Sequence, residues 1–207
     1  MIFYQNNNIT IYSSSDGFNY AKILNYQENK HFFDFFFENE KNDFNYECKI
    51  YANEINTLDY FLKNNIGNQK IFEYLFLCLM EQIKYLELNS MTIPVFNPRD
   101  IVYMKSNDNY YFYFLNPRKV FSLNNDTIII DKLFDKNDFT SKELNDVEDI
   151  PNNNILKTAS YWSLGSLLKY CFRTIDIELE DIKYRQLYWA LKKCLEVNPK
   201  HRYLLFI

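Results

Sequence analysis

The start of the chain alternates between apolar and polar residues, which is the spacing of β-strands. Residues 9–12 and 18–24 form two β-prone runs, and Ser15, Asp16 and Gly17 between them are a turn signal. This pattern predicts a hairpin near the beginning of the chain.

A second pair of runs follows at residues 31–37 and 44–52, on either side of a polar turn at residues 39–43. Apolar and polar side chains alternate in the later run, as they do in a half-buried strand. Together the four runs predict a small antiparallel sheet. The short interval between Leu24 and His31 leaves no room for a helix in this prediction.

The spacing becomes helical at Thr57, a good N-cap for a short helix over residues 58–62. A long helix is predicted over residues 68–88, because its apolar residues recur three or four positions apart. These residues are Ile71, Phe72, Leu75, Phe76, Leu79, Met80, Ile83 and Leu86. So wide an apolar face predicts burial on several sides. The change of pattern divides the chain into residues 1–56 and 57–207, which we expect to form one bilobal unit.

A loop broken by two prolines covers residues 93–100, and the runs 101–104 and 110–114 predict a third hairpin. Residues 116–154 are polar and acidic apart from three isoleucines at 128–130. We expect a long, partly mobile loop there that holds a short strand or helix.

Helical spacing of apolar residues predicts two further helices, over residues 159–173 and 182–196. Each contains one tryptophan within an apolar pattern, Trp162 in the first and Trp189 in the second. Both tryptophans are therefore expected to pack in the core, and Trp162 and Leu164 are expected to be buried.

Composition supports a folded chain and argues against several functions. Hydrophobic residues make up 47% and aromatic residues 19% of the chain, which is enough for a core. The net charge of -4 and the lack of a basic run argue against a nucleic-acid partner, because such binding depends on neutralising phosphates. The chain has 3 glycines, and phosphate-binding loops need glycine for close backbone approach, so no nucleotide cofactor is expected.

The four cysteines, Cys48, Cys78, Cys171 and Cys194, are far apart and lack the spacing of a metal or redox motif. They indicate a reducing compartment, so we expect a cytoplasmic protein. With two histidines and no cluster of ligands, no metal site is expected. Neither a signal peptide nor an apolar run of about 18 residues is visible, so this chain is expected to contain no transmembrane segment.

The order of these elements and three short motifs resemble those of protein kinases. Residues 161–168 (YWSLGSLL) resemble the start of the central helix of the kinase C-lobe, and residues 191–202 (LKKCLEVNPKHR) resemble the end of that lobe. Residues 97–102 (NPRDIV) resemble the end of the catalytic loop. The resemblance covers roughly residues 44–207. It implies an α+β fold in which a small antiparallel N-lobe sheet packs on a mainly helical C-lobe.

The same resemblance implies structural roles for Trp162, Gly165 and Arg202. In kinases the arginine at the position of Arg202 pairs with a glutamate at the end of the activation segment, for which Glu148 is the candidate here. Ser160 stands where kinases carry the aspartate that braces the catalytic loop.

Other positions depart from the kinase pattern, and each departure removes a catalytic group. If Asp100 takes the place of the metal-binding asparagine, the catalytic base becomes Val95, which accepts no proton. The second metal ligand falls on Leu115 and Asn116, where no carboxylate stands. The glycine-rich loop falls on residues 13–17, with one glycine. The resemblance therefore implies a catalytically inactive pseudokinase without a metal or cofactor.

Lys22 superficially matches the lysine that pairs with phosphates in kinases. It comes early in the chain, is expected on the second strand and has no predicted helix after it. We therefore interpret Lys22 as a solvated strand lysine.

A pseudokinase would act by binding a protein partner, as an interaction, scaffold or regulatory domain. Five phenylalanines on one short strand cannot all face a single core, because alternate side chains point to opposite faces. The candidate partner-binding residues are Phe32, Phe33, Phe35, Phe36 and Phe37. The alternative is that other parts of this chain cover both faces.

A narrower resemblance concerns the amino-terminal two-thirds of the chain, with its truncated small lobe and the motif that follows the long helix. Residues 97–120 (NPRDIVY…YYFYFLNPRKV) resemble the cytosolic pseudokinase domain of the EssB/YukC family, a membrane-anchored component of bacterial type VII secretion systems. This resemblance implies a membrane-anchored context if the chain continues beyond Ile207. The alternatives are a free-standing pseudokinase, an atypical kinase with a rearranged nucleotide site, and an α+β protein unrelated to kinases.

Overall fold

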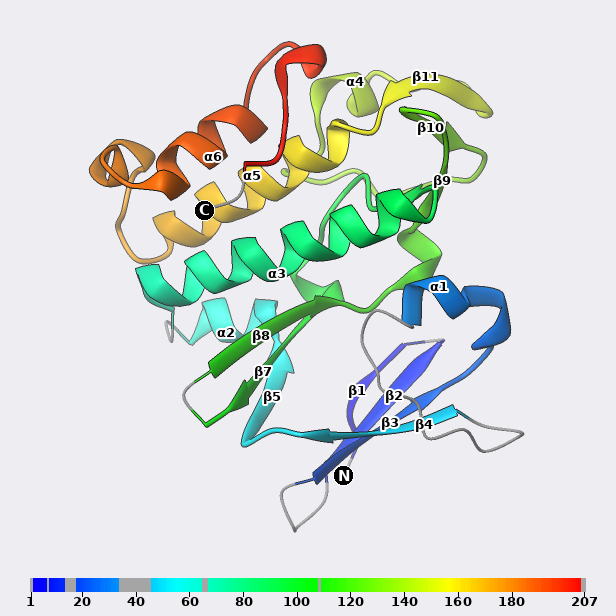
Figure 1. The fold of residues 1–207 in the computed structure, drawn as a ribbon, viewed down its shortest axis with the longest axis vertical. Coiled ribbons are helices and arrows are strands. Elements are labelled where there is room, and N and C mark those ends of the chain that lie inside the picture. Colours follow the sequence, from blue (N-terminus) through cyan, green and yellow to red (C-terminus); the bar gives the residue numbers. More distant parts are fainter. Residues whose placement is uncertain are drawn as a thin grey trace.

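The computed structural model describes residues 2–6, 8–13, 18–33, 46–64, 67–107 and 109–205. Within these ranges the chain has an α+β fold with small antiparallel sheets, as the pattern predicts. Figure 1 shows a sheet at the bottom of the view and the long helix α3 (Gln69–Leu88) across the middle. Helices α5 (Ala159–Arg173) and α6 (Gln186–Cys194) lie on the other side of α3.

The first sheet has four antiparallel strands in sequence order. They are β1 (Ile2–Gln5), β2 (Ile9–Ser13), β3 (Phe18–Ile23) and β4 (Tyr46–Tyr51). In β2 and β3 the buried residues Ile9 and Ile11 lie opposite Ile23 and Ala21, so these four side chains share one face. The sheet confirms the predicted strands β2, β3 and β4, and it adds β1, which the pattern did not predict.

A short helical segment follows β3, where the sequence predicted no helix. It consists of the 3₁₀ helix η1 (Gln27–Asn29) and the α-helix α1 (Lys30–Phe33). The prediction of a strand beginning at His31 is therefore wrong. A run of bulky apolar residues cannot by itself distinguish a strand from a buried helical turn.

The phenylalanines of this segment are not an exposed patch. Phe32 and Phe33 are fully buried and pack edge to face, with ring centres 5.1 Å apart. Successive side chains on a helix point about 100° apart rather than to opposite sides, so neighbouring phenylalanines can enter the same core. Phe32 and Phe33 are therefore core residues and not candidates for binding a partner. Phe35, Phe36, Phe37 and the predicted turn at residues 39–43 lie outside the described residues.

The next two helices begin at polar caps. The Thr57 Oγ1 accepts a hydrogen bond from the Tyr60 backbone N–H (3.3 Å) at the start of α2 (Leu58–Lys63), as predicted. Asn68 caps α3 in the same way, accepting from the Ile71 backbone N–H at 3.0 Å. All eight apolar positions predicted to face the core from α3 are buried, which confirms its wide apolar face.

A second sheet has the strand order β5-β7-β8. Its strands are β5 (Glu54–Thr57), β7 (Ile101–Ser106) and β8 (Asn109–Phe114), and the last two form the predicted hairpin. The buried Gln82 side chain of α3 satisfies the edge strand β8 at Phe114. Its amide donates to the Phe114 carbonyl (2.9 Å) and accepts from the Phe114 N–H (3.0 Å). This pair of bonds ties the hairpin to α3 and satisfies the backbone groups of Phe114 at the edge of the sheet.

The segment 116–154, expected to be mainly a loop, contributes most of a third sheet. The strand order is β11-β10-β9-β6. Its strands are β6 (Met91–Thr92), β9 (Phe121–Asn124), β10 (Thr127–Ile130) and β11 (Asn152–Leu156). The isoleucine run forms a strand, and residues 131–151 are mainly loop around the short helix α4 (Lys142–Asn145), but the strands β9 and β11 were not predicted. In β9, Phe121 and Leu123 are buried and alternate with exposed residues, a period-2 pattern too short to stand out.

The helices α5 and α6 confirm the last two predicted helices, although α6 begins four residues later than expected. Leu164 is fully buried, as predicted, but Trp162 is only half-buried and Trp189 is 56% exposed. The expectation that both tryptophans lie in the core is therefore wrong. Gly165 lies where α5 and α6 approach closely, and a Cβ atom there would come within 2.9 Å of the Cys194 Cβ.

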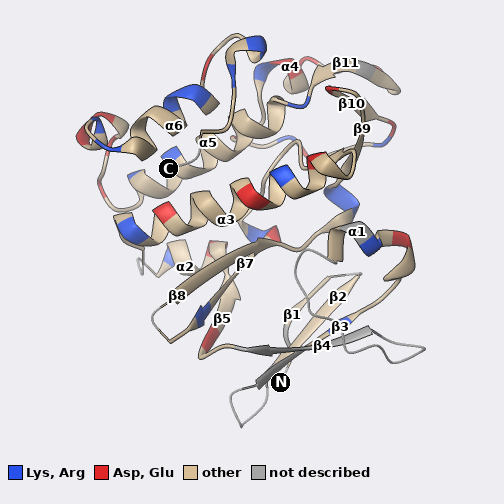
Figure 2. Cartoon of the chain, viewed as in Figure 1, with Lys and Arg blue, Asp and Glu red and all other residues tan. Residues whose placement is uncertain are grey.

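Short helical turns connect the larger elements. They are η2 (Pro98–Asp100), η3 (Pro117–Lys119), α4 (Lys142–Asn145), η4 (Leu179–Ile182) and η5 (Pro199–His201). Cys78, Cys171 and Cys194 are free thiols. Acidic and basic residues are interspersed along α3 in the view of Figure 2. Among the described residues, no helix combines the length and apolar character that crossing a membrane requires.

Candidate functional site

The loop between β6 and β7 carries the first candidate residues. Val95, at the predicted position of the catalytic base, is buried in an apolar cluster with Phe121 and Ile128. The Asn97 side chain accepts a hydrogen bond from the Arg99 N–H (3.0 Å) and so starts the turn η2, which ends at Asp100. The loop thus places Val95 in the core, and its one carboxylate, Asp100, lies immediately before β7.

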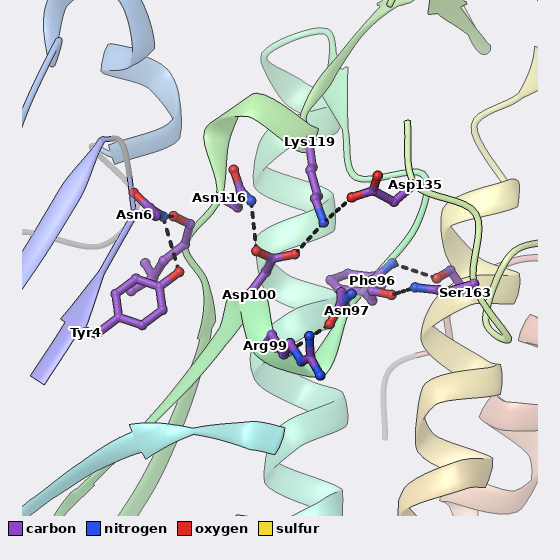
Figure 3. Close-up of polar contacts among 12 residues, drawn as sticks. Tyr4, Asn6, Phe96, Asn97, Arg99, Asp100, Asn116, Lys119, Asp135 and Ser163 are labelled. Carbon is purple, nitrogen blue, oxygen red and sulfur yellow. Dashed lines mark hydrogen bonds and ion pairs between the residues drawn. The ribbon is translucent and has the colours of Figure 1, made fainter. Parts of the chain in front are cut away.

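Asp100 forms the centre of a polar network that is drawn in Figure 3. The Asn116 Nδ2 donates to one carboxylate oxygen of Asp100 at 2.8 Å. The Lys119 Nζ lies 2.9 Å from the other oxygen and 3.1 Å from the Asp135 Oδ2. Asp100 and Asn116, which the sequence placed at the two metal-ligand positions, are therefore in direct contact. No sequence motif indicated that Lys119 and Asp135 would join them.

The Lys119 ammonium is the positive charge of this network. Burial lowers its pKa, but the hydrogen bonds and the negative charges of Asp100 and Asp135 outweigh burial, so the net shift is upward. Lys119 therefore stays protonated and neutralises Asp100 with a charge that is part of the chain.

The first sheet reaches the same region through the turn between β1 and β2. The Asn6 Nδ2 donates to the Leu115 carbonyl oxygen at 2.6 Å and to the Tyr4 hydroxyl oxygen at 3.2 Å (Figure 3). The Asn6 Oδ1 accepts from the Asn8 and Ile9 N–H groups, both at 2.8 Å, which fixes the turn. Asn6 therefore holds the first sheet against the segment that follows β8.

Tyr4 is a buried phenol beside this contact. Burial raises its pKa to about 12; the Asn6 hydrogen bond opposes this shift and the negative charge of Asp100 adds to it. The pKa of Tyr4, on the first sheet, therefore depends in part on the charge of Asp100.

Two serines at the start of α5 brace the loop from the other side. Ser160, for which the sequence resemblance predicted the position of the kinase bracing aspartate, forms a 2.7 Å hydrogen bond with the Thr92 hydroxyl. The Ser163 Oγ accepts from the Phe96 N–H at 2.8 Å, and the Asn137 Nδ2 donates to the Phe96 carbonyl at 2.8 Å. Neutral hydroxyl groups thus hold this loop to α5, and the sequence analysis identified only Ser160 among them.

Arg202 is buried and joins three segments, but its partner is not Glu148, which is exposed. The guanidinium binds both carboxylate oxygens of Glu143, and it also donates to the carbonyls of Glu196 (2.6 Å) and Val197 (3.1 Å). The prediction of a glutamate partner in this segment named the wrong residue because the short helix α4 was not predicted. Glu143 lies in the first turn of α4, facing Arg202.

Trp162 and Gly165 complete this structural cluster. The Cζ atom of Arg202 lies 4.8 Å from the centre of the Trp162 ring, a cation–π contact that holds the ring in place. Gly165 allows the end of α6 to approach α5, which brings the Glu196 and Val197 carbonyls within reach of Arg202.

Lys22 lies on the third strand, and a short helix does follow it, so both reasons for dismissing it were wrong. Its side chain is half-buried. Glu28 in the following helical segment is exposed. On the neighbouring strand β4, the residue opposite Lys22 is Glu47.

The described residues contain no group of three or more His, Cys, Asp and Glu side chains that could hold a metal ion. Neither a protein-family model nor a curated protein matches this chain. Function therefore has to be argued from the network around Asp100, from the Arg202 cluster and from the surface.

Proposed function

We propose that this chain is a protein-kinase-like pseudokinase that binds another protein and does not transfer phosphate. The proposal treats the sheet β1–β4 as a reduced N-lobe and the part from Thr57 onward as the C-lobe. The order of elements supports it: a small sheet, a short helix, a long buried helix, a loop, a hairpin and then further helices. So do the glutamate partner of Arg202 and the hydroxyl brace from Ser160.

The state of Asp100 is the observation that carries the inactive part of the proposal. One carboxylate oxygen accepts a hydrogen bond from the Asn116 amide, and the other forms an ion pair with the Lys119 ammonium at 2.9 Å and has no further partner among the described residues. Phosphoryl transfer needs metal ions held by such carboxylates to neutralise the charge on the phosphates. A tethered ammonium that already neutralises Asp100 leaves little attraction for a second cation at this position.

Two further contacts support the same conclusion. Val95 is buried among apolar side chains, so no base faces the cleft from its position. Asn6 joins the first sheet to the Leu115 carbonyl across the place where a nucleotide would lie between two kinase-like lobes. In this proposal the chain's own groups take the positions of the nucleotide and its metal ion.

Thermal unfolding with millimolar ATP, in the presence of Mg²⁺ or Mn²⁺, tests the proposal. A ligand at 100 times its Kd stabilises the folded state by about 2.7 kcal/mol, which would raise the Tm by several degrees. We expect no such rise for the wild type and no transfer of the γ-phosphate to protein or water. The matched control is Lys105→Ala, which removes a half-buried lysine of β7 that lies outside the Asp100 network.

A rise of several degrees in the wild type would overturn the proposal and favour the atypical kinase with a rearranged nucleotide site. The double variant Lys119→Ala with Asn116→Asp sharpens the test, because it removes the tethered cation and supplies a second carboxylate. Metal-dependent stabilisation of this variant, but not of Lys105→Ala, would support the role assigned to Lys119.

A further inference from the structure

One side of α5 forms a wall of an open groove of about 430 Å³, which we call the α5 groove. Its other residues come from the loop before α4 and from the end of α6. The lining includes Phe139, Trp162, Ser166, Lys169, Tyr170 and Arg173. The groove lies outside the Asp100 network and next to the Arg202 cluster.

The aromatic part of the groove is held in place. Phe139 and Tyr170 pack edge to face with ring centres 5.6 Å apart, and the Arg202 guanidinium stacks on Trp162. Trp162 is half-buried and Tyr170 is exposed, so both rings still offer surface to a ligand. Rigid aromatic side chains at a groove are frequent energetic centres of protein interfaces, because little entropy is lost when they are covered.

The groove carries charged residues of both signs. Lys169 and Arg173 lie one helical turn apart and therefore on the same side of α5. Lys169 is half-buried and has neither an ion pair nor a hydrogen bond among the described residues, whereas Arg173 forms an exposed pair with Glu178. Asp138 is the one acidic residue among the described residues that line the groove.

We propose that the α5 groove binds an acidic peptide segment of a partner protein through an aromatic side chain and a neighbouring carboxylate. The ring packs against Trp162 and Tyr170, and the carboxylate pairs with Lys169. Lys169 is the cation of the groove that has no partner among the described residues, and this favours a ligand that brings a carboxylate. This inference rests on the proposed role in protein binding and names the chemistry of the partner.

Tryptophan fluorescence provides a direct test, because the chain has 2 tryptophans and only Trp162 lines the groove. The substitution Trp189→Phe, at an exposed position, makes Trp162 the single reporter. The probe is a blocked peptide, acetyl-Glu-Glu-Phe-Glu-amide, titrated to millimolar concentration. We expect a saturable change in the emission of Trp162, with weaker binding to Gln-Gln-Phe-Gln and to Glu-Glu-Ala-Glu.

Charge variants in the same background identify the contact. Lys169→Glu should weaken binding about tenfold or more, and Asp138→Asn should strengthen it, because it removes the opposing charge. Lys105→Glu is the matched control, since Lys105 is also half-buried but lies on β7. An unchanged Trp162 emission, or equal binding by Lys169→Glu and Lys105→Glu, would overturn the inference.

Anionic phosphatidylserine vesicles serve as the competing ligand. A change of Trp162 emission with vesicles but not with the peptide would also overturn the inference, because it would assign the groove to a lipid surface. The peptide titration contains no nucleotide, so its failure leaves the proposed inactivity toward ATP standing. Conversely, binding of ATP–Mg²⁺ would refute the proposed function without changing the outcome at the groove.

Discussion

Two of the carboxylate–cation pairs in the described part of the chain, Glu143 with Arg202 and Asp100 with Lys119, are built differently. In the pair of Glu143 and Arg202, the arginine side chain is 1% exposed and uses both ends of its guanidinium on the carboxylate. In the pair of Asp100 and Lys119, the lysine side chain is 25% exposed and makes one contact with each of two carboxylates. Arg202 also satisfies two backbone carbonyls, whereas Lys119 lies between Asp100 and Asp135 alone.

This difference teaches that similar charges serve two purposes here. A planar guanidinium binds a carboxylate in one geometry, so Arg202 fixes α4 against the end of α6. An ammonium is a point charge on a flexible stem, so Lys119 can neutralise two carboxylates without fixing their orientation. We therefore interpret Arg202 as a structural anchor and Lys119 as the group that neutralises Asp100.

The largest expected effect is the loss of stability in Arg202→Ala. Arg202→Ala leaves Glu143 half-buried without its partner, and it frees the Glu196 and Val197 carbonyls. Loss of one partner of a buried pair costs about 3 to 5 kcal/mol. We expect the free energy of unfolding, measured by urea unfolding, to decrease by this amount. Arg202→Lys should recover only a small part, because an ammonium cannot bind the carboxylate in the same two-point geometry.

The control is Arg173→Ala, which breaks the pair with Glu178, where the two side chains are 55% and 60% exposed. An exposed pair contributes about 0 to 1 kcal/mol. Equal losses for Arg202→Ala and Arg173→Ala would refute the interpretation of Arg202 as an anchor.

A second substitution tests the anchor without touching a charge. Gly165→Ala places a methyl group within 2.9 Å of the Cys194 Cβ, so α6 has to move away from α5. Overpacking of this kind costs about 1 to 3 kcal/mol. The shift also moves the carbonyls that bind Arg202. The double variant should therefore lose less stability than the sum of the losses in Gly165→Ala and Arg202→Ala.

Ser166→Ala, at the neighbouring and half-buried position, is the control and should change the free energy of unfolding little. Strict additivity of Gly165→Ala and Arg202→Ala would show that the close approach of the helices does not position the anchor.

A third substitution, Lys119→Ala, tests the more exposed of the two pairs. Lys119→Ala leaves Asp100 without a positive partner, which should cost about 1 to 2 kcal/mol, less than the loss of Arg202 because the site is partly solvated. Adding Asp100→Asn should recover part of that loss, since the unpaired charge is then removed. Urea unfolding of the two single variants and the double variant measures this coupling; a coupling near zero would contradict the neutralising role of Lys119.

The long helices could be predicted from the sequence because many of their residues show the same apolar spacing. In α3 the periodic apolar face and the Asn68 cap agree, and α5 was predicted with its observed bounds. Short elements gave too few residues for a period. The strand β9 has four residues, and the Phe-rich α1 fitted both a strand and a helical turn.

The network around Asp100 could be predicted only in part. Motif resemblance placed Asp100 and Asn116 at related positions, and the structure brings them into contact. Lys119 and Asp135 come from the segment expected to be a loop, and no spacing rule links them to Asp100. Partners of a charge are set by tertiary structure, which is also why Glu148 was chosen over Glu143 for Arg202.

The smallest expected effect uses Tyr4 to report on the charge of Asp100 from the first sheet. Its pKa is about 12 in the folded protein, against an ordinary value of 10.0. Below pH 10 the Tyr4 phenol is protonated in both the folded and the unfolded protein, so its full contribution to the free energy of unfolding is present. Between pH 10 and 12 the unfolded chain loses the proton first, and this contribution is lost as the pH rises. Tyr4→Phe should therefore change stability by less than about 1 kcal/mol at neutral pH and should lose less stability than the wild type on going to pH 12.

Tyr113→Phe provides the comparison, because burial also raises the pKa of Tyr113 to about 12, but Asp100 is not among the causes. In a Lys119→Ala background Asp100 is not neutralised, so the pKa of Tyr4 should rise further while that of Tyr113 stays the same. Stability curves from pH 8 to 12 for the four combinations would measure this difference. If Lys119→Ala changed the alkaline loss at Tyr4 and Tyr113 equally, Lys119 would not be the group that neutralises Asp100, and the contrast with Arg202 would rest on geometry alone.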